Sequence, residues 1–434
     1  MNQGSLPLLI IGNGGAAVHA ALGARQAGFK GRIRLVADRE GPAFNPMLAP
    51  YYLAGSIPFE RCFPFGADLY IRHELECLFG SPVEYLDPRN REVRLADNRK
   101  IPYEKCLLAT GASPVLPGVP GLRESSRVFT LRTASDTTRL ADTLPVTRKA
   151  AILGASLVGL KVAEIFVHRG IETVLIDVAP QILPPAALPE CASSLENHIL
   201  KNGVQLRLSA FLEHLEETSQ RAVLHFKEGP PLEADLCLVC TGVRANLDFL
   251  DSTWTGVDRG IIVNHRLETQ TEGIYAAGDV SQGTNLLTGK KEVLGLWGNA
   301  CYQGRCAGIN MAGGRSSYPG SIPDHVSTFF GIHFVHLGDV HRQGSEIAVL
   351  SGDDGDDGVK FWLVFEGKRL VGANLLGNLE HAGRLRRTIL LRLDWGEHLS
   401  QLRERLSSEI LDRALCTLLP AQHRFISTQY PAGP

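Results

Sequence analysis

The hydrophobic positions of the chain first describe a strand, a turn, a helix and a second strand. An apolar run at residues 7–11 leads into a glycine-rich turn at residues 12–15. An alanine-rich stretch with helical spacing follows as far as Gly28, and a second apolar run at residues 32–36 ends at Asp38. The pattern therefore predicts a βαβ unit with an acidic residue at the end of its second strand.

The same arrangement returns in the middle of the chain. An apolar run from Ala150 leads to a second turn between Gly154 and Gly159, a helix continues to about Gly170, and a strand at residues 172–176 closes at Asp177. A single glycine turn is a weak signal, but a repeat in one chain favours two dinucleotide-binding units and thus two dinucleotides.

The first turn carries the residue types that a bound pyrophosphate requires. Gly12 allows the tight turn, Gly14 lets the backbone approach the phosphates, and Ala17 permits close packing of helix on strand. The pyrophosphate would lie on the helix N-terminus, and Asp38 would accept a hydrogen bond from a ribose hydroxyl. The second turn departs from this pattern at Ser156, where the middle glycine is expected.

Three later apolar runs also end in small or polar residues. They lead to Thr110 and Gly111, to Thr241 and Gly242, and to residues 278–279, a Gly-Asp pair. Since α/β sheets bind ligands at the carboxyl ends of their strands, the Gly-Asp pair stands where a ligand is expected.

Composition limits the remaining classes of protein. The chain has 434 residues, 44% hydrophobic and 21% charged, which is typical of a globular enzyme of about three domains. The formal net charge of -2 gives no global attraction to nucleic acid or to an anionic membrane. The longest hydrophobic stretch, residues 150–167, contains Lys161 and Glu164, so we expect no membrane span.

The cysteines predict neither a disulfide framework nor a metal site. There are nine, an odd number, without a paired CxxC array, which fits a reducing cytoplasm. The pairs Cys237/Cys240 and Cys301/Cys306 have spacings unsuited to bridges and are expected to be buried apolar residues.

Taken in order, these markers resemble the FAD-dependent pyridine nucleotide-disulfide oxidoreductase superfamily from about residue 6 to about residue 390. The resemblance implies an α/β fold with two Rossmann-like, three-layer nucleotide-binding domains, the NAD domain inserted in the FAD domain, and a C-terminal α+β interface domain. The implied boundaries are 1–118 with 246–322 for FAD, 119–245 for NAD, and 323–434 for the interface domain.

The resemblance also assigns binding residues, while it implies no catalytic side chain because hydride transfer takes place at flavin N5. For FAD the positions are Gly12, Gly14, Gly15, Ala16, Ala17, Asp38, Asn45, Met47, Ala109, Thr110, Gly111, Gly278, Asp279, Trp297 and Ala300. For NAD the positions are Gly154, Ser156, Leu157, Val158, Gly159, Asp177 and Gly242. Asp177 favours NADH, because a carboxylate binds the ribose 2′-hydroxyl and repels a 2′-phosphate.

The missing thiols select a branch of the superfamily. Residues 40–60 hold no CxxxxC pair, and Met47 stands where peroxidases and coenzyme A disulfide reductases have their cysteine. A thioether forms neither a sulfenate nor a mixed disulfide. The chain therefore resembles the NADH-dependent ferredoxin, rubredoxin and nitrite reductase flavoproteins, although Asn45 and Pro50 replace an arginine and a lysine of that branch.

This branch implies an enzyme that moves electrons between NAD(H), FAD and an iron–sulfur or ferredoxin-like protein, as a homodimer or as a subunit of a larger oxidoreductase. Two alternatives stay open: an NADH oxidase without a thiol, and an FAD-binding redox sensor or scaffold. Four arginines between Arg384 and Arg392 could dock an acidic partner or form a solvated helix face.

The second helix carries a further departure from the family. Lys161 replaces a glutamate that contacts the nicotinamide carboxamide, and we expect it either to pair with an acid near the flavin or to extend to solvent. Glu164 is expected on a solvated face of the same helix.

Overall fold

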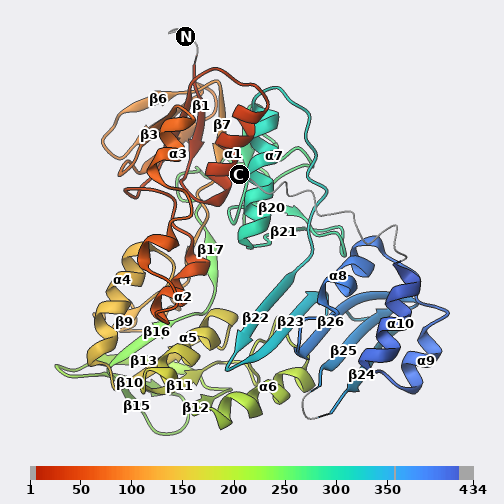
Figure 1. Ribbon diagram of the computed structural model, residues 1–434. Helices are drawn as coiled ribbons and strands as arrows, with labels where there is room; N and C mark the ends of the chain where they lie inside the picture. Colours follow the sequence, from red (N-terminus) through yellow and green to blue (C-terminus); the bar gives the residue numbers. More distant parts are fainter. Residues whose placement is uncertain (1–5, 356–357, 420–434) are drawn as a thin grey trace. The chain divides into compact units, whose positions relative to one another are not determined.

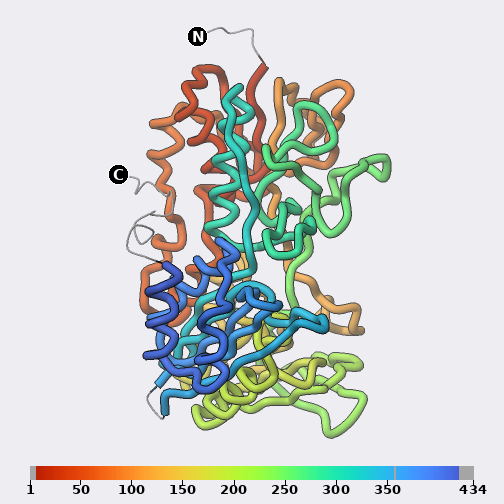
Figure 2. Tube along the Cα trace, turned by 90° about the vertical axis from the view of Figure 1, so that its right-hand side faces the viewer, coloured from red at the N-terminus to blue at the C-terminus, as the bar shows by residue number. Residues whose placement is uncertain are grey.

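The computed structural model describes residues 6–355 and 358–419, and these form two compact units. The first unit contains residues 6–118, 128–147 and 238–321, and the second contains residues 119–127, 148–237 and 322–419. Each unit is assembled from separate stretches of the chain, which Figure 2 follows by colour.

The first unit is built on a parallel sheet in the order β19-β7-β1-β2-β3. Strands β1 and β2 pair in register from Leu8 with Ile33 to Ile11 with Val36, as the first apolar pattern predicts. Its strands are β1 (Leu8–Ile11), β2 (Ile33–Val36), β3 (Leu75–Leu78), β7 (Lys105–Leu108) and β19 (Ile274–Ala276).

Helices and smaller sheets complete this unit. The helices are α1 (Gly15–Gln26), α2 (Ala49–Leu53), α3 (Ala67–Arg72), α4 (Ala134–Thr143) and α7 (Trp297–Met311). The smaller sheets are β4 (Val83–Asp87), β5 (Glu92–Leu95) and β6 (Lys100–Pro102); β8 (Ala112–Pro114) with β17 (Val243–Ala245); and β18 (Ile261–Ile262), β20 (Ser281–Thr284) and β21 (Lys291–Glu292).

Helices α1 and α7 lie side by side in both ribbon and tube views (Figures 1 and 2). Glycines allow this approach, because a Cβ on Gly304 would collide with the carbonyl of Ala16 and a Cβ on Gly308 with that of Ala20. The close packing holds the N-termini of both helices near the carboxyl ends of the parallel strands.

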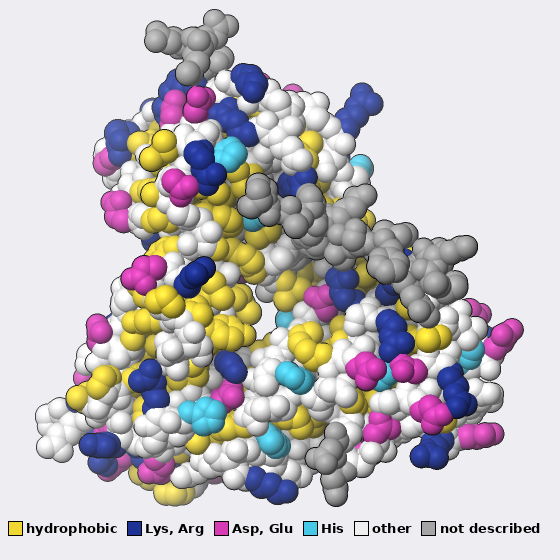
Figure 3. All heavy atoms as spheres, in the orientation of Figure 1, with side chains coloured by type: hydrophobic (Ala, Val, Ile, Leu, Met, Phe, Trp, Pro, Cys, Tyr) yellow, Lys and Arg dark blue, Asp and Glu magenta, His cyan; other side chains and the backbone are white. Residues whose placement is uncertain are grey.

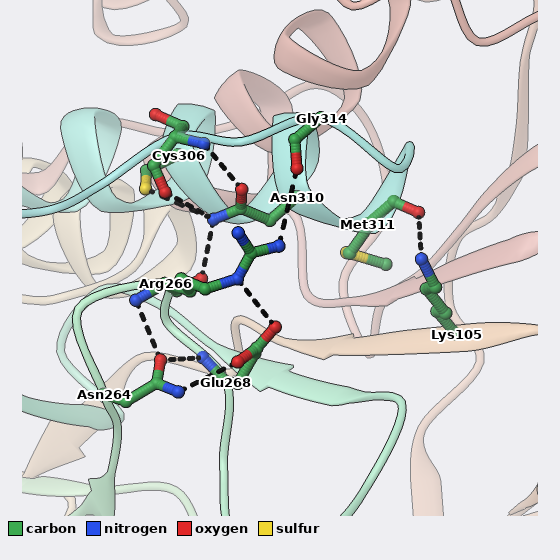
Figure 4. A network of polar contacts seen from close by, with 9 residues as sticks. Lys105, Asn264, Arg266, Glu268, Cys306, Asn310, Met311 and Gly314 are labelled. Atoms are coloured by element: carbon green, nitrogen blue, oxygen red, sulfur yellow. Dashed lines mark hydrogen bonds and ion pairs between the residues drawn. The ribbon is translucent and has the colours of Figure 1, made fainter.

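A polar network fixes the far end of α7 (Figure 4). Asn310 donates to the carbonyl of Arg266 at 2.9 Å, and Arg266 donates to Glu268 at 3.0 Å. Lys105 on β7 donates to the carbonyl of Met311 at 2.8 Å. The C-terminal carbonyls of α7 thereby gain a cation, which stabilises that end of the helix.

The second unit contains the second βαβ repeat. Strands β10 (Lys149–Leu153), β11 (Glu172–Ile176) and β12 (Val204–Arg207) are parallel, and β16 (Leu236–Val239) neighbours β10. Helices α5 (Leu157–His168) and α6 (Pro189–Lys201) follow β10 and β11 along the chain, and β13 (Leu212–Glu217), β14 (Ala222–Phe226) and β15 (Leu232–Ala234) form a small sheet.

The C-terminal part of this unit is an antiparallel sheet with helices, in the order β22-β23-β26-β25-β24. The strands are β22 (Asp324–Phe329), β23 (Ile332–Gly338), β24 (Ile347–Asp353), β25 (Lys360–Glu366) and β26 (Arg369–Gly377), and the helices are α8 (Ala382–Leu391), α9 (Leu399–Glu404) and α10 (Ser408–Leu418). The expected fold class, two Rossmann-like parts and a C-terminal α+β part, is confirmed.

Two of the four arginines between Arg384 and Arg392 are held in ion pairs. Arg384 pairs with Asp412 of α10, and Arg386 pairs with Asp324 of β22. Two of the four cations proposed for docking are thus neutralised by ion pairs within the unit, which weakens the docking hypothesis.

Candidate flavin site

A cavity of about 780 Å³ opens in the first unit where four parallel strands end. Ile11 of β1, Val36 of β2, Ala109 after β7 and Ala277 after β19 all line it. Its volume lies in the upper part of the usual range for ligand pockets.

The first glycine turn forms one wall of this cavity. Gly12 has a φ of +120°, and a Cβ there would collide with the carbonyl of Ala109. Gly14 caps α1 without a side chain, and a Cβ on Gly14 would point into open space. The first-turn N–H groups of α1 therefore suit an anionic group such as a pyrophosphate.

An ion pair also belongs to the lining of the cavity. The guanidinium of Arg132 is 2.6 Å from the carboxylate of Asp279, and it also donates to the carbonyl of Ala112 at 3.1 Å. The side chain of Asp279 is only 15% exposed. Our sequence reasoning missed Arg132, since its only local signal is the capping box of the next helix, Thr133 with Asp136.

Hydrogen bonds join two backbone segments that line the cavity, one at Thr110 and one at Asn246. The hydroxyl of Thr110 donates to the carbonyl of Asn246 at 2.9 Å, and the amide of Asn246 donates to the carbonyl of Thr110 at 2.8 Å. Asn246 lines the cavity and was also missed. The reciprocal bonds hold the Thr110–Gly111 turn in place.

Helix α7 presents its first turn to the same space. Trp297, the first residue of α7, stacks on Phe65 with ring centroids 6.4 Å apart and an interplanar angle of 19°. Both Trp297 and Ala300 line the cavity. The N-terminal dipole of α7 would favour negative charge there.

Most of the residues expected to bind FAD meet at this cavity. Those that line it are Gly12, Gly14, Gly15, Ala16, Asp38, Met47, Ala109, Thr110, Gly111, Gly278, Asp279, Trp297 and Ala300. Ala17 is fully buried in α1, and the side chain of Asn45 accepts a hydrogen bond from the backbone N–H of Met47 at 3.0 Å. These two residues are structural neighbours of the cavity and do not form its lining.

The second glycine turn lies in the second unit. The hydroxyl of Ser156 accepts a hydrogen bond from the N–H of Gly159 at 3.2 Å and caps α5, whose first residues are Leu157 and Val158. Gly154 has a φ of +108°. The N-terminus of α5 is thus capped by its own chain, unlike that of α1.

Asp177 is fixed at this second turn. Its carboxylate accepts hydrogen bonds from the N–H groups of Ala155 at 2.7 Å and Ala179 at 2.8 Å. The two bonds hold the carboxylate beside the turn, where a ribose would be expected. Gly242, in contrast, lies in the first unit between β16 and β17, with a φ of +106°.

Lys161 and Glu164 form an ion pair with each other. The ammonium of Lys161 is 2.7 Å from the Glu164 carboxylate and donates to the carbonyl of Thr328 at 2.9 Å. Glu164 also accepts from the N–H of Phe330 at 2.9 Å, and its side chain is only 10% exposed. The expected solvated face is wrong for Glu164, because the β22–β23 turn packs on this face of α5.

The thiols do not form a relay at this cavity. No disulfide joins any of the nine cysteines, and none of them lies among the described residues that line the cavity. Burial raises the pKa of the Cys301 thiol to about 12, so that group stays protonated at neutral pH. The sulfur present in the lining is the thioether of Met47.

Comparison with known proteins identifies the family. Residues 6–304 match the family model described as pyridine nucleotide-disulphide oxidoreductase. The chain belongs to this family. It is therefore an oxidoreductase that uses FAD and a nicotinamide dinucleotide.

Individual relatives differ in their named activities. The chain is 32% identical over 332 residues to the NADH-dependent phenylglyoxylate dehydrogenase subunit epsilon of Aromatoleum evansii, covering 76% of this chain and 78% of that one. It is 26% identical over 354 residues to an NADH oxidase of Methanocaldococcus jannaschii, covering 80% and 77%. A covalent putidaredoxin reductase–putidaredoxin complex shares the fold, with a TM-score of 0.86, 23% identity, and coverage of 95% and 99%.

The cavity fits the cofactor that the family requires. It offers an uncapped helix N-terminus for phosphates, an acid at the end of β2 for a ribose, and the buried carboxylate of Asp279 for hydroxyl groups of the cofactor. In the part of the chain that the structure describes, no group of three or more His, Cys, Asp or Glu residues is arranged to hold a metal ion, and no helix is long and apolar enough to cross a bilayer.

Proposed function

We propose that this protein is the flavin subunit of an NAD(H)-linked electron-transfer enzyme, which exchanges electrons directly with an iron–sulfur or ferredoxin-like protein. The observation that carries the proposal is a cofactor cavity whose described lining contains Met47 and no thiol. When bound there, FAD supplies two-electron exchange with NAD(H) and one-electron exchange with a metal centre. Without a cysteine relay, the acceptor must approach the cofactor itself.

The residues of this chain would bind and orient the two dinucleotides. The N-terminus of α1, Asp38, and the Arg132–Asp279 pair would hold FAD in the first unit. Asp177 and the turn from Gly154 to Gly159 would hold NADH in the second. Hydride transfer needs stacking of the two rings and no proton transfer from a side chain, which agrees with the assignment of no catalytic acid or base.

The wall around Met47 supports an apolar contact with a protein partner. The segment from Gly41 to Phe59 contains no charged residue, and the side chains of Met47 and Tyr51 are 57% and 49% exposed. Figure 3 shows hydrophobic side chains gathered around α2, which belongs to this segment. Stable subunit interfaces are similarly depleted in charge.

The relative from Aromatoleum evansii, named as a subunit of an NADH-dependent dehydrogenase, favours membership of a larger complex. We propose that this protein too works in such an assembly or as a homodimer. An odd number of cysteines, nine, without a paired CxxC array supports a reducing compartment, and we place the protein in the cytoplasm.

Anaerobic stopped-flow absorbance tests the function. The flavin-loaded protein is mixed with NADH, and the reduced protein is then exposed to air or to an oxidised ferredoxin. Fast bleaching by NADH, slow reoxidation in air and fast reoxidation by ferredoxin are expected. Fast reoxidation in air would establish an NADH oxidase instead, and absent bleaching would favour a sensor or scaffold.

A further inference from the structure

A buried tyrosine connects two walls of the cofactor cavity. The side chain of Tyr70 on α3 is 5% exposed and does not itself line the cavity. Its hydroxyl donates to the side-chain carbonyl of Asn13 at 2.8 Å and accepts from the N–H of Ala43 at 3.0 Å. One oxygen atom therefore contacts both the glycine turn and the segment that leads to Met47.

Asn13 extends this connection. It lies between Gly12 and Gly14, and its amide donates to the carbonyl of Gly41 at 2.9 Å. Asn13 and Gly41 both line the cavity, and Gly41 has a φ of +79°. Because glycine-rich backbone loses the most conformational entropy on ordering, side-chain hydrogen bonds at Asn13 reduce the freedom that cofactor binding would otherwise have to remove.

The ring of Tyr70 is fixed independently of its hydroxyl. It packs edge-on against Phe79, with ring centroids 5.8 Å apart and an interplanar angle of 89°. Replacement by phenylalanine should keep this contact and remove only the two hydrogen bonds. The hydroxyl can thus be tested separately from packing.

We propose that Tyr70 is a positioning residue for FAD, which acts through Asn13 and Ala43 to hold the pyrophosphate turn and the 41–47 wall in the geometry that receives the cofactor. This inference rests on the proposed placement of FAD in the cavity. It also implies a coupling, because the conformations of the pyrophosphate turn and of the 41–47 wall depend on the same Tyr70 hydroxyl.

The experiment measures FAD affinity and apoprotein stability on the same full-length variants. Tyr70→Phe should raise the dissociation constant of FAD about tenfold, followed by flavin fluorescence on titration of the flavin-free protein. Asn13→Ala should have a similar effect. The double variant should lose less affinity than the sum of the two single effects, because both changes remove the shared hydrogen bond between Tyr70 and Asn13.

Asn310→Ala is the control. Asn310 is 1% exposed and donates to the carbonyl of Arg266 at 2.9 Å at the far end of α7, and neither residue lines the cavity. It should lower the thermal midpoint of the flavin-free protein as Tyr70→Phe does, but leave FAD affinity unchanged. Tyr103→Phe removes a buried hydroxyl without a hydrogen-bond partner and should change neither quantity.

The outcomes separate this inference from the proposed function. If Tyr70→Phe and Asn310→Ala give the same FAD dissociation constant, Tyr70 is merely structural and the inference is wrong. Additive effects of Tyr70→Phe and Asn13→Ala would also overturn it. If the unaltered protein does not bind FAD, the proposed site itself fails.

Discussion

The guanidinium of Arg132 lies 2.6 Å from the carboxylate of Asp279, and both side chains line the cofactor cavity. They come from two separate stretches of the first unit, residues 128–147 and 238–321, on either side of residues 148–237. The segment from Gly41 to Phe59, which also contributes to the lining, contains no charged residue. Arg132 therefore supplies positive charge that the 41–59 segment lacks.

Loss of Arg132 should lower the flavin potential. In Arg132→Gln, the carboxylate of Asp279 would be unpaired in a partly buried site and would disfavour the additional negative charge of the reduced cofactor. We expect the midpoint potential to fall by about 30 mV, equivalent to about 1.4 kcal/mol for a two-electron couple. Dye-coupled reductive titration measures it. The double variant Arg132→Gln with Asp279→Asn should recover most of the shift; an equally low potential there would contradict the electrostatic explanation.

Asp177 should set the preference between nicotinamide cofactors. Asp177→Ala removes a carboxylate that now accepts from Ala155 and Ala179, and with it the repulsion of a 2′-phosphate. The ratio of kcat/KM for NADH to that for NADPH should fall at least about tenfold, or about 1.4 kcal/mol. Steady-state rates with an artificial acceptor give both values. An unchanged ratio would mean that Asp177 has only a structural role.

Removal of one partner of the Lys161–Glu164 ion pair should lower the unfolding free energy more than replacement of both partners by apolar residues. Glu164→Leu leaves a poorly solvated ammonium and should cost about 2 kcal/mol of unfolding free energy, below the range for fully buried pairs because the Lys161 side chain is 22% exposed. The double variant with Lys161→Met should recover part of this loss. Urea denaturation checks both variants, and a double variant less stable than Glu164→Leu would refute the argument.

His336 should make the second unit sensitive to acid. It is 4% exposed, and burial, with a smaller effect of the neighbouring His325, lowers its pKa from 6.5 to about 3. A depressed histidine pKa gives stability that is present above pH 6.5 and is lost as the pH falls towards 3, by up to about 1.4 kcal/mol per pH unit. In His336→Leu the unfolding free energy should therefore fall less steeply between pH 7 and pH 5.

The exposed residue His265 provides the control for this measurement. His265→Gln should keep the pH slope of the unaltered protein. Equal slopes in all three proteins would show that His336 does not govern the acid response.

The sequence predicts this fold well where local signals coincide with it. Residue spacing alone predicts the two glycine turns, the strands before them and the acids after them. Hydrophobic periodicity and turn chemistry are properties of short segments, so they can be recognised without the rest of the fold. Most predicted FAD positions accordingly line one cavity. Their binding roles stay predictions until the cofactor is measured on variants.

The sequence does not predict the contacts between residues that lie far apart along the chain. Glu164 lies on a helix face that spacing assigns to solvent, but the turn at Phe330 covers it. Arg132 and Tyr70 depend on partners at Asp279 and Asn13 that no local pattern identifies. Helical periodicity indicates which residues share a face, but not which distant segment will pack there.

The glycine-mediated packing of α1 on α7 sets an order for the maturation of the protein on the ribosome. The glycine turn at residues 12–15 and α1 are synthesised first, but their close neighbour extends from Trp297 to Met311. A nascent chain that ends before this helix has the glycine turn without the helix that packs against α1. Stable acquisition of flavin should accordingly await synthesis of α7, after the whole inserted nucleotide-binding segment has already emerged.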